Sequence, residues 1–524
     1  MHPTPVRTTR IAIAAAVLVV LPLLLLILQY GPGRDQGIYL VVARVMQAGG
    51  MPYRDAWDFK PPGIFLVYRA ALAFGGGMLP VRAIEALALA SQALAFAVLT
   101  RRFMGSAVPG AWAGALAVLI HAQLEFWHTG QPESFGGPVL AWALVLATNS
   151  ARGTLSRVAA GALFGFAAFL KPPLAGGGVL VAAILAWRGA RTATAGRARS
   201  ALAPVAAMAF GALAFVAAIL GWLALGGAFP DFLETFRDFV PRYTALGLHQ
   251  QSLPGLAGRA FLEWFLGYSA LIPAGIALLL FCRGPEEETW GLALVGAVLL
   301  PQLAGIAMQA KFFAYHYGAA LPFGALLAAW GAARAWRRFP DRFARVGGLL
   351  VALVLLRSES TPPSPWLGRA ASRVHAAFSR ADRDRILDTL QSSGSLDAAA
   401  NRTAARWIRD ATRPGSSLFV WGFEPILYDD ARRVPASRYV YNAPVRAAWY
   451  SGVSRPRLLE ELAGRKPEAI LVERDDVLPG VTGDALDSAH ALERFAGLRE
   501  LLDRDYAVAA DTGRFVCWLR RPGS

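Results

Sequence analysis

Long apolar runs, separated by short polar and basic stretches, fill the first two thirds of the chain. A helix needs about 20 mostly apolar residues to cross the hydrocarbon core of a bilayer, and most of these runs approach that length. The pattern predicts eleven transmembrane helices, at residues 11–29, 80–100, 107–122, 136–150, 157–171, 173–187, 201–225, 262–282, 290–309, 313–333 and 346–357. The chain is therefore expected to be a polytopic α-helical membrane protein.

The segment 31–79, between the first two predicted spans, has helical patterns of its own. In residues 36–48 the apolar positions recur at the spacing of one helical face, and Gly49-Gly50 is a stop signal for that helix. A second apolar stretch, 61–74, is too short to cross a bilayer and contains an arginine, so it predicts an interfacial helix. The first loop is therefore expected to be folded.

From residue 358 onward the chain is polar and charged, and strand-like runs alternate with helical patterns. Strands are predicted at 417–421, 469–473, 506–510 and 515–519, and helices at 397–411, 456–465 and 487–503. Such alternation is typical of a small α/β domain. The sequence thus predicts a transmembrane domain over 1–357 and a soluble α/β domain over 358–524, the latter without a nucleotide motif, catalytic triad or metal cluster.

Composition and charge agree with a membrane protein, since 55% of the residues are hydrophobic and 17% are charged. The formal charge of +16 is explained by basic residues beside membrane spans and does not indicate a nucleic-acid partner. With the N-terminus in the cytoplasm, sixteen basic residues fall in cytoplasmic segments and ten on the other side, so eleven spans place the C-terminal domain outside. Cys282 and Cys517 then lie on opposite sides and cannot pair. The first apolar run lacks an Ala-x-Ala cleavage pattern and is expected to remain as an anchor.

Lysine is rare in this chain: of 52 lysines and arginines, only four are lysine, and two of these, Lys60 and Lys171, precede a Pro-Pro pair. Proline suits the first turn of a helix and pushes the preceding residue into an extended conformation. A lysine is thereby placed ahead of a helix N-terminus, where partial positive charge also attracts anions. Lys60, Lys171 and Lys311 fall at predicted outer ends of the membrane helices, which favours phosphate binding, although snorkelling to water is an alternative.

The first loop carries a recognisable motif. Asp35-Gln-Gly-Ile-Tyr39, followed by Gly50-Met-Pro-Tyr53-Arg-Asp55-Ala-Trp57-Asp58-Phe-Lys60-Pro-Pro, closely resembles the first periplasmic loop of membrane glycosyltransferases of the GT-C fold. These include the dolichyl-phosphate-mannose:protein mannosyltransferases, the lipid A aminoarabinose transferases and the rhizobial lipopolysaccharide core transferases. The likeness in layout covers about residues 10–335, and the tail resembles the variable periplasmic domain of such enzymes.

The resemblance implies that the protein moves a pentose or hexose from a polyprenyl-phosphate carrier to a lipid, glycan or protein acceptor outside the cytoplasm. It further implies a place in a bacterial inner membrane, contact with membrane lipids and no cofactor. Asp35 is then the acid that deprotonates the acceptor hydroxyl, and Lys60 holds the carrier phosphate. Many relatives carry Asp-Glu where this chain has Asp35-Gln36, which leaves a second-acid or divalent-metal role at this position open. Further donor or phosphate-binding residues are expected to be Tyr53, Asp58, Glu133, Lys171, Lys311 and His316.

Each candidate residue also has a structural interpretation. Asp35 suits the N-cap of a helix that starts at Gln36, and Asp58, like Asp55, suits a turn. Glu133 suits a solvated turn, and His316, between two tyrosines, an interfacial aromatic belt. For the whole protein, a transporter or flippase of a lipid-linked sugar is the main alternative, and a non-catalytic receptor built around the tail is a third.

Overall fold

The computed structural model describes residues 6–149, 153–193, 196–248, 252–339, 341–359, 365–379 and 381–523. Contacts between residues divide the chain into two compact units, each assembled from separate stretches of sequence. The first, called here the helical unit, comprises Met1–Gln29, Arg82–Ile219 and Gln250–Ser372. The second, called the loop–sheet unit, comprises Tyr30–Val81, Leu220–His249 and Arg373–Ser524. The predicted boundary between residues 357 and 358 stays a prediction.

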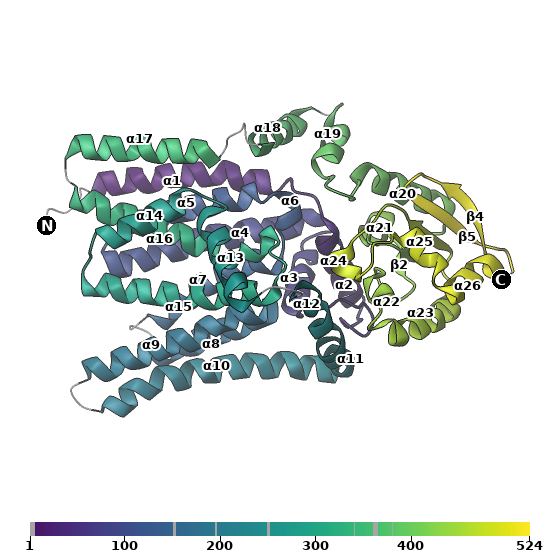
Figure 1. Cartoon of the computed structure of the whole chain (residues 1–524), viewed down its shortest axis with the longest axis horizontal. Coiled ribbons are helices and arrows are strands. Elements are labelled where there is room, and N and C mark those ends of the chain that lie inside the picture. The colour runs from purple at the N-terminus through teal and green to yellow at the C-terminus, as the bar shows by residue number, and fades with distance from the viewer. Residues whose placement is uncertain are drawn as a thin grey trace. The chain divides into compact units, whose positions relative to one another are not determined.

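The helical unit is built from helices, and the long ones up to residue 359 match the predicted apolar runs. In chain order these are α1 (Val6–Ile27), α4 (Met78–Met104), α5 (Val108–Gln123), α6 (Glu125–His128), α7 (Pro132–Ala147), α8 (Gly153–Leu170), η1 (Pro172–Ala175), α9 (Gly176–Thr192), α10 (Arg197–Leu225), α13 (Leu253–Leu266), α14 (Leu271–Phe281), α15 (Glu286–Gln309), η3 (Ala314–Tyr317), α16 (Leu321–Arg338), α17 (Arg342–Glu359) and α18 (Pro365–Phe378). Helix α5 packs against both α1 and α16, and the three run side by side (Figure 1).

Small residues let some of these helices approach closely. A Cβ atom at Gly331 of α16 would lie 2.0 Å from the carbonyl oxygen of Gly275 of α14. Likewise, a Cβ atom at Gly161 of α8 would lie 2.0 Å from the carbonyl oxygen of Met208 of α10. In a lipid environment helices associate through packing of this kind, because the bilayer provides no hydrophobic drive between them.

Among the described residues, six helices are long and apolar enough to cross a membrane, or seven if one bent pair is a single span. The bent pair is α13 and α14, which meet at 96° across a break of four residues, where one straight span at 262–282 was expected. The predicted number of eleven spans is therefore not confirmed, although a helix lies at each predicted position.

The sheet of the loop–sheet unit has five strands among the residues described, in the order β2-β1-β3-β5-β4. Their bounds are β1 (Ser417–Trp421), β2 (Val434–Pro435), β3 (Ala469–Glu473), β4 (Tyr506–Asp511) and β5 (Phe515–Arg520). Strand β1 pairs in parallel with β2 and β3, and β5 is antiparallel to β3 and β4. The four predicted strands are confirmed and only the short β2 was not predicted.

Helices of the C-terminal segment surround this sheet. They are α19 (Arg383–Leu390), α20 (Ala398–Ala411), α21 (Ile426–Ala431), α22 (Ala443–Arg446), α23 (Ser451–Arg465), α24 (Pro479–Thr482), α25 (Ser488–Glu493) and α26 (Ala496–Asp505). The predicted helix at 487–503 is two helices, α25 and α26, separated by Arg494 and Phe495. The expectation of a small C-terminal α/β region is confirmed.

The loop–sheet unit also contains the first loop and a third stretch of chain. The first loop forms α2 (Arg34–Gln47) and α3 (Gly63–Leu72), close to the two predicted helices. The third stretch forms α11 (Phe229–Glu234), the π-helical turn η2 (Thr235–Phe239) and α12 (Val240–Leu248). Trp57 joins all three parts, since its ring centre lies 4.8 Å from that of Phe239 and 6.0 Å from that of Tyr441. Edge-to-face and tilted aromatic contacts of this kind stabilise a core beyond the area they bury.

Candidate functional site

Asp35 lies in the first turn of α2. The helix begins at Arg34 with Gly33 as its N-cap, so Asp35 is the second helical residue and the alternative that it is the N-cap is wrong. The side chain is half-buried, and its negative charge is favoured by the partial positive charge of the helix N-terminus. The neighbouring Gln36 is fully buried, and its Oε1 accepts a hydrogen bond from the backbone N–H of Gly33 at 3.0 Å. Gln36 therefore stabilises the start of the helix that carries Asp35.

Asp58 is buried, with a side-chain exposure of 1%, so it is not a solvated turn residue. Its Oδ1 accepts a hydrogen bond from the hydroxyl of Tyr441 at 2.9 Å, while Oδ2 has no hydrogen-bond partner among the described residues. Burial raises the pKa of Asp58 to about 6, against the lowering effect of the Lys60 ammonium and of the Tyr441 hydroxyl; the Asp35 carboxylate raises it further. The opposing effects of Lys60 and Asp35 show that the three groups influence one another. Asp55, in contrast, is a turn residue whose Oδ2 accepts from the N–H of Met51 at 2.7 Å.

Lys60 is half-buried, and its ammonium lies 5.2 Å from the ring centre of Phe59. Helix α3 has Pro62 as its N-cap, so Lys60 stands two residues before the cap. The hydroxyl of Tyr53 donates to the carbonyl oxygen of Lys60 at 2.7 Å. Tyr53 is fully buried and adopts φ 69°, a left-handed conformation that is unfavourable for a bulky residue and is typical of functional sites. Tyr53 therefore fixes the backbone from which the Lys60 side chain extends.

Glu133 and Lys171 form an ion pair in the helical unit, between Oε1 of Glu133 and the Lys171 ammonium. Glu133 is the second residue of α7 and is 2% exposed, so the solvated-turn interpretation is wrong. Its second oxygen, Oε2, has no hydrogen-bond partner in the described part of the chain. Lys171 is the N-cap of η1 and is extended, with φ −160° and ψ 119°, as expected for a residue before proline.

A charged network that the sequence analysis missed supports the turn before α7. Nη1 of Arg82 donates to Oε2 of Glu85 at 2.7 Å and to the hydroxyl of Thr129 at 2.9 Å. Nε2 of His121 lies 3.0 Å from Oε1 of Glu85. All of these side chains are buried. The signal was present in the sequence, because ionisable residues inside a predicted span are rare and usually have a specific role.

Lys311 lies at an unusual backbone turn. Its neighbours Ala310 and Phe312 both adopt left-handed conformations, with φ 51° and 47°. Strain of this kind persists only where the surrounding structure imposes it, and it gathers at functional sites. Just downstream, His316 is 6% exposed, and its ring is perpendicular to that of Tyr315 with the ring centres 4.5 Å apart. His316 is therefore buried, and its place in an interfacial belt stays an alternative.

The predicted site residues divide between the two units. Asp35, Tyr53, Asp58 and Lys60 belong to the loop–sheet unit. Glu133, Lys171, Lys311 and His316 belong to the helical unit, where a Cβ atom at Gly318, directly after η3, would lie 3.2 Å from the Cβ of Glu133. Within the described ranges no three His, Cys, Asp or Glu side chains are arranged to hold a metal ion. The roles of these residues stay predictions.

Comparison with known proteins identifies the fold. No protein-family model matches the sequence, and no curated protein matches it. ArnT from Cupriavidus metallidurans bound to undecaprenyl phosphate is similar in structure, with a TM-score of 0.61, 16% identity and coverage of 99% of each chain. ArnT from Cupriavidus metallidurans in the apo state gives a TM-score of 0.58 with 16% identity over 98% of each chain. ArnT is a lipid A aminoarabinose transferase of the GT-C fold, so the predicted GT-C fold is confirmed.

Proposed function

We propose that the protein is an integral membrane glycosyltransferase that moves a sugar from a polyprenyl-phosphate carrier to an acceptor outside the cytoplasm. The observation that carries this proposal is the group formed by Asp35, Asp58 and Lys60 in the first loop. Asp35 supplies a half-buried carboxylate at a helix N-terminus, and Lys60 supplies an ammonium on a backbone whose carbonyl accepts a hydrogen bond from Tyr53. The charges of both residues act on the pKa of the buried Asp58. The likeness of the whole chain to ArnT bound to undecaprenyl phosphate supports the same reaction class.

The chemistry needs these groups. A bond forms between the acceptor oxygen and the anomeric carbon while the bond from that carbon to the carrier phosphate breaks, through an oxocarbenium-like state. The carboxylate of Asp35 takes the proton of the acceptor hydroxyl. The ammonium of Lys60 stabilises the negative charge that grows on the departing polyprenyl phosphate. Tyr53 serves the same step indirectly, because it holds the carbonyl of Lys60.

The residues of the helical unit have lesser roles in this proposal. Lys171 is paired with the buried Glu133, so a phosphate has to compete with that carboxylate for the charge of Lys171. Lys311 supplies a cation between the strained residues Ala310 and Phe312, and His316 supplies an aromatic ring that contacts Tyr315. We place the protein in a bacterial inner membrane with a cytoplasmic N-terminus and an external C-terminal region, and the acceptor is a lipid, glycan or protein.

A transporter or flippase of a lipid-linked sugar is the alternative. The observation that favours it is the buried network of Arg82, Glu85 and His121, since charges within spans often line transport pathways. However, each of these side chains contacts another member, and Arg82 also binds Thr129 in the turn before α7. The network therefore has a structural explanation that needs no transported solute.

Transfer of radiolabelled sugar by the purified protein tests the proposal. Undecaprenyl-phosphate-linked pentoses and hexoses serve as donors, with cell-envelope lipid as the acceptor. Asp35→Asn keeps the size of the side chain but removes the base, so we expect transfer to fall about 10²–10⁴-fold, the usual range for acid–base catalysis. An Asn variant that transfers at the wild-type rate contradicts the role of Asp35. Movement of the labelled lipid across liposomes without formation of product would favour the flippase.

A further inference from the structure

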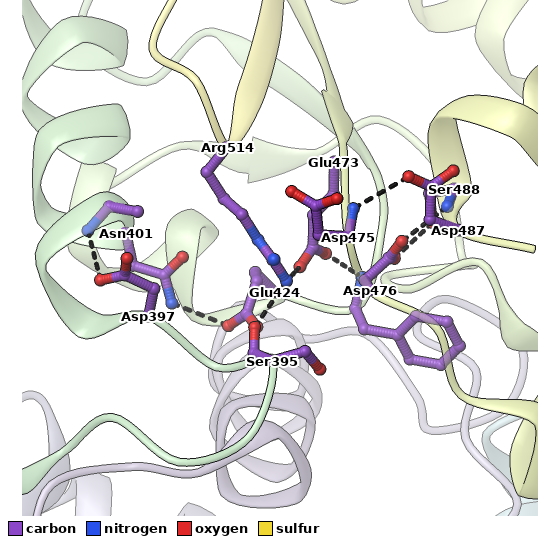
Figure 2. A network of polar contacts seen from close by, with 12 residues as sticks. Ser395, Asp397, Asn401, Glu424, Glu473, Asp475, Asp476, Asp487, Ser488 and Arg514 are labelled. Carbon is purple, nitrogen blue, oxygen red and sulfur yellow. Dashed lines mark hydrogen bonds and ion pairs between the residues drawn. The ribbon is translucent and has the colours of Figure 1, made fainter.

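Two carboxylates stand at one edge of the C-terminal sheet. Glu473 is the last residue of β3, and Glu424 follows the end of β1 by three residues. Because β1 and β3 are parallel neighbours, their carboxyl ends meet at the same edge, the place where open α/β sheets usually bind ligands. Both side chains are buried, with exposures of 0% and 1%. Figure 2 shows them close to Asn401, Ser395 and Arg514.

Arg34, the residue before Asp35, occupies this edge. Its Nε donates to Oε1 of Glu424 at 2.9 Å, and its Nη2 lies 3.4 Å from Oε1 of Glu473. Its Nη1 donates to the hydroxyl of Ser395 at 2.9 Å. The guanidinium is thus shared by groups 361 to 439 residues away in the sequence, and it is only 7% exposed.

The remaining partners of the two carboxylates show that the contact is specific. Nδ2 of Asn401 donates to Oε2 of Glu424 at 2.7 Å, and the N–H of Phe423 donates to Oε2 of Glu473 at 2.6 Å. Arg514 adds a second cation, with Nη2 at 2.8 Å from Oε1 of Glu473. Burial raises the pKa of Glu473 to about 7, and the nearby Glu424 raises it further, while Arg34 and Arg514 lower it. Arg34 and Arg514 therefore oppose the effect of burial and favour the charged form of the carboxylates.

Helix α2 is held along the face that begins with Arg34. One turn later, a Cβ atom at Gly37 would lie 3.2 Å from the backbone nitrogen of Ile426 in α21, so the two segments are in close contact. Two turns further on, Nε of Arg44 binds Oδ1 of Asp429 at 2.7 Å. Asp35 is rotated from this face by one residue, about 100° in an α-helix. The first turn of α2 is thus tied to the C-terminal sheet, while Asp35 points along an adjacent face.

We propose that Arg34 is a positioning residue for Asp35: by binding Glu424 and Glu473 it fixes the first turn of α2, so the C-terminal α/β region takes part in the transfer reaction. The inference rests on the proposed function. Arginine suits the task because its planar fork reaches both carboxylates and Ser395 at once, which a lysine ammonium cannot do. Misplacement of a reacting group by about 1 Å is enough to lower a rate about a hundredfold.

The test compares Arg34→Met with Arg44→Met. Both variants remove an arginine of α2 that is paired with a carboxylate of the C-terminal segment, but only Arg34 adjoins Asp35. We expect Arg34→Met to lower kcat about 10- to 100-fold while KM for the undecaprenyl-phosphate sugar stays within about twofold. We expect Arg44→Met to keep kcat within about twofold. Hydrogen–deuterium exchange of the amides of residues 37–40 should rise about tenfold in Arg34→Met and stay unchanged in Arg44→Met.

Several outcomes decide the inference. Equal losses of kcat in both variants would show that α2 needs docking in general, which overturns a specific role for Arg34. Unchanged kcat and exchange in Arg34→Met would overturn it as well. If wild-type protein transfers no sugar, the proposed function fails, and the exchange data alone still decide whether Arg34 fixes the first turn. If Arg34→Met does not fold, Arg34→Lys is measured, and its transfer at the wild-type rate overturns the inference.

Discussion

Lys60 and Lys171 each precede two prolines, and their surroundings differ. Lys171 is paired with Glu133, a carboxylate that is 2% exposed. The ammonium of Lys60 lies over the ring of Phe59. Its carboxyl neighbour Asp58 has a pKa raised to about 6, and its Oδ1 accepts a hydrogen bond from the hydroxyl of Tyr441. Lys171 is the extended N-cap of η1, as expected for a residue before proline, whereas Lys60 stands two residues before Pro62, the N-cap of α3. The charge of Lys171 is paired with Glu133, 38 residues away, while Phe59 and Asp58 are sequence neighbours of Lys60. The Lys-Pro-Pro sequence therefore does not determine the surroundings of its lysine.

This difference suggests separate tasks. A phosphate that binds Lys171 has to compete with Glu133. Removal of the lysine leaves the carboxylate of Glu133 buried without a cation, which lowers the stability of the fold. A phosphate that binds Lys60 meets a neighbouring carboxyl, Asp58, that burial drives toward its neutral form. We therefore expect Lys60 to act on the carrier and Lys171 to act mainly on the structure around Glu133.

Among the four lysines, replacing Lys60 is expected to have the largest effect on transfer. A charge-assisted hydrogen bond contributes about 1.5–3 kcal/mol, so Lys60→Ala should lower kcat/KM about 10- to 100-fold. Thermal stability should change little, because Lys60 is half-buried and its backbone is held by Tyr53. The measurement is transfer against carrier concentration, together with a thermal unfolding curve.

Lys60→Arg is the matched control for charge. It should recover part of the rate, since a planar guanidinium prefers a fixed two-point fit while an ammonium is a mobile point charge. Full activity of either Lys60 variant would remove the distinction between the two lysines.

Replacing Lys171 should affect stability more than transfer, the opposite of what we expect for Lys60. Lys171→Ala leaves Glu133 buried without its cation, so we expect a clear loss of stability and a smaller loss of transfer than in Lys60→Ala. The double variant Lys171→Ala/Glu133→Ala should regain much of the stability, with a coupling energy of about 0.5–3 kcal/mol in a double-mutant cycle. If Lys171→Ala unfolds like wild type and transfers as poorly as Lys60→Ala, the two lysines have the same task.

The neighbouring acids provide a third comparison, through pH. The pKa of Asp58 is raised from 3.8 to about 6, so the folded protein binds this proton more tightly than the unfolded chain. The contribution of Asp58 to stability is therefore present below about pH 4 and is lost as the pH rises through about 6. Since one pKa unit corresponds to about 1.4 kcal/mol, the loss is on the order of 3 kcal/mol.

Asp58→Asn removes this titration while it keeps an oxygen for the Tyr441 hydroxyl. Relative to the variant, wild-type stability should fall between about pH 4 and pH 7, which paired unfolding curves measure. Other buried acids, such as Glu473, are present in both proteins and cancel in the difference. A constant difference across this range would show that Asp58 titrates as an ordinary carboxyl and that its surroundings resemble water more than the structure indicates.

The sequence predicts the local elements of this protein well, because their causes are local. Strand β3 lies at the predicted residues 469–473, and β1 at 417–421, since runs of strand-forming residues mark them. The GT-C fold follows from the first-loop motif and the apolar runs. The bend between α13 and α14 was not predicted, because hydropathy alone does not show whether a span continues or breaks.

The site was only partly predictable. Asp35 and Lys60 stand out through their motif and through the rarity of lysine. Their supports do not, because Tyr441 reaches Asp58 across 383 residues and Glu424 reaches Arg34 across 390. Such contacts arise from tertiary packing and leave no periodic pattern. Buried charged residues in a polar segment point to such contacts, but the sequence does not show which charged residues are buried.

Lys466 is the lysine from which we expect no effect on transfer. It is exposed and is the C-cap of α23, in a left-handed conformation with φ 42°. Its backbone makes two hydrogen bonds: its N–H donates to the carbonyl of Leu462 at 2.8 Å, and its own carbonyl accepts from Arg520 at 3.0 Å. Lys466→Ala keeps both contacts and the same backbone strain, so transfer and stability should match wild type. Lys466→Gly relieves the strain and should stabilise the protein by up to about 1 kcal/mol.

Transfer assays on alanine variants of all four lysines, run together, check that Lys466→Ala keeps wild-type transfer. A loss at Lys466 equal to that at Lys60 would mean that lysine itself, in any position, supports the activity, and the contrast between Lys60 and Lys171 would lose its meaning.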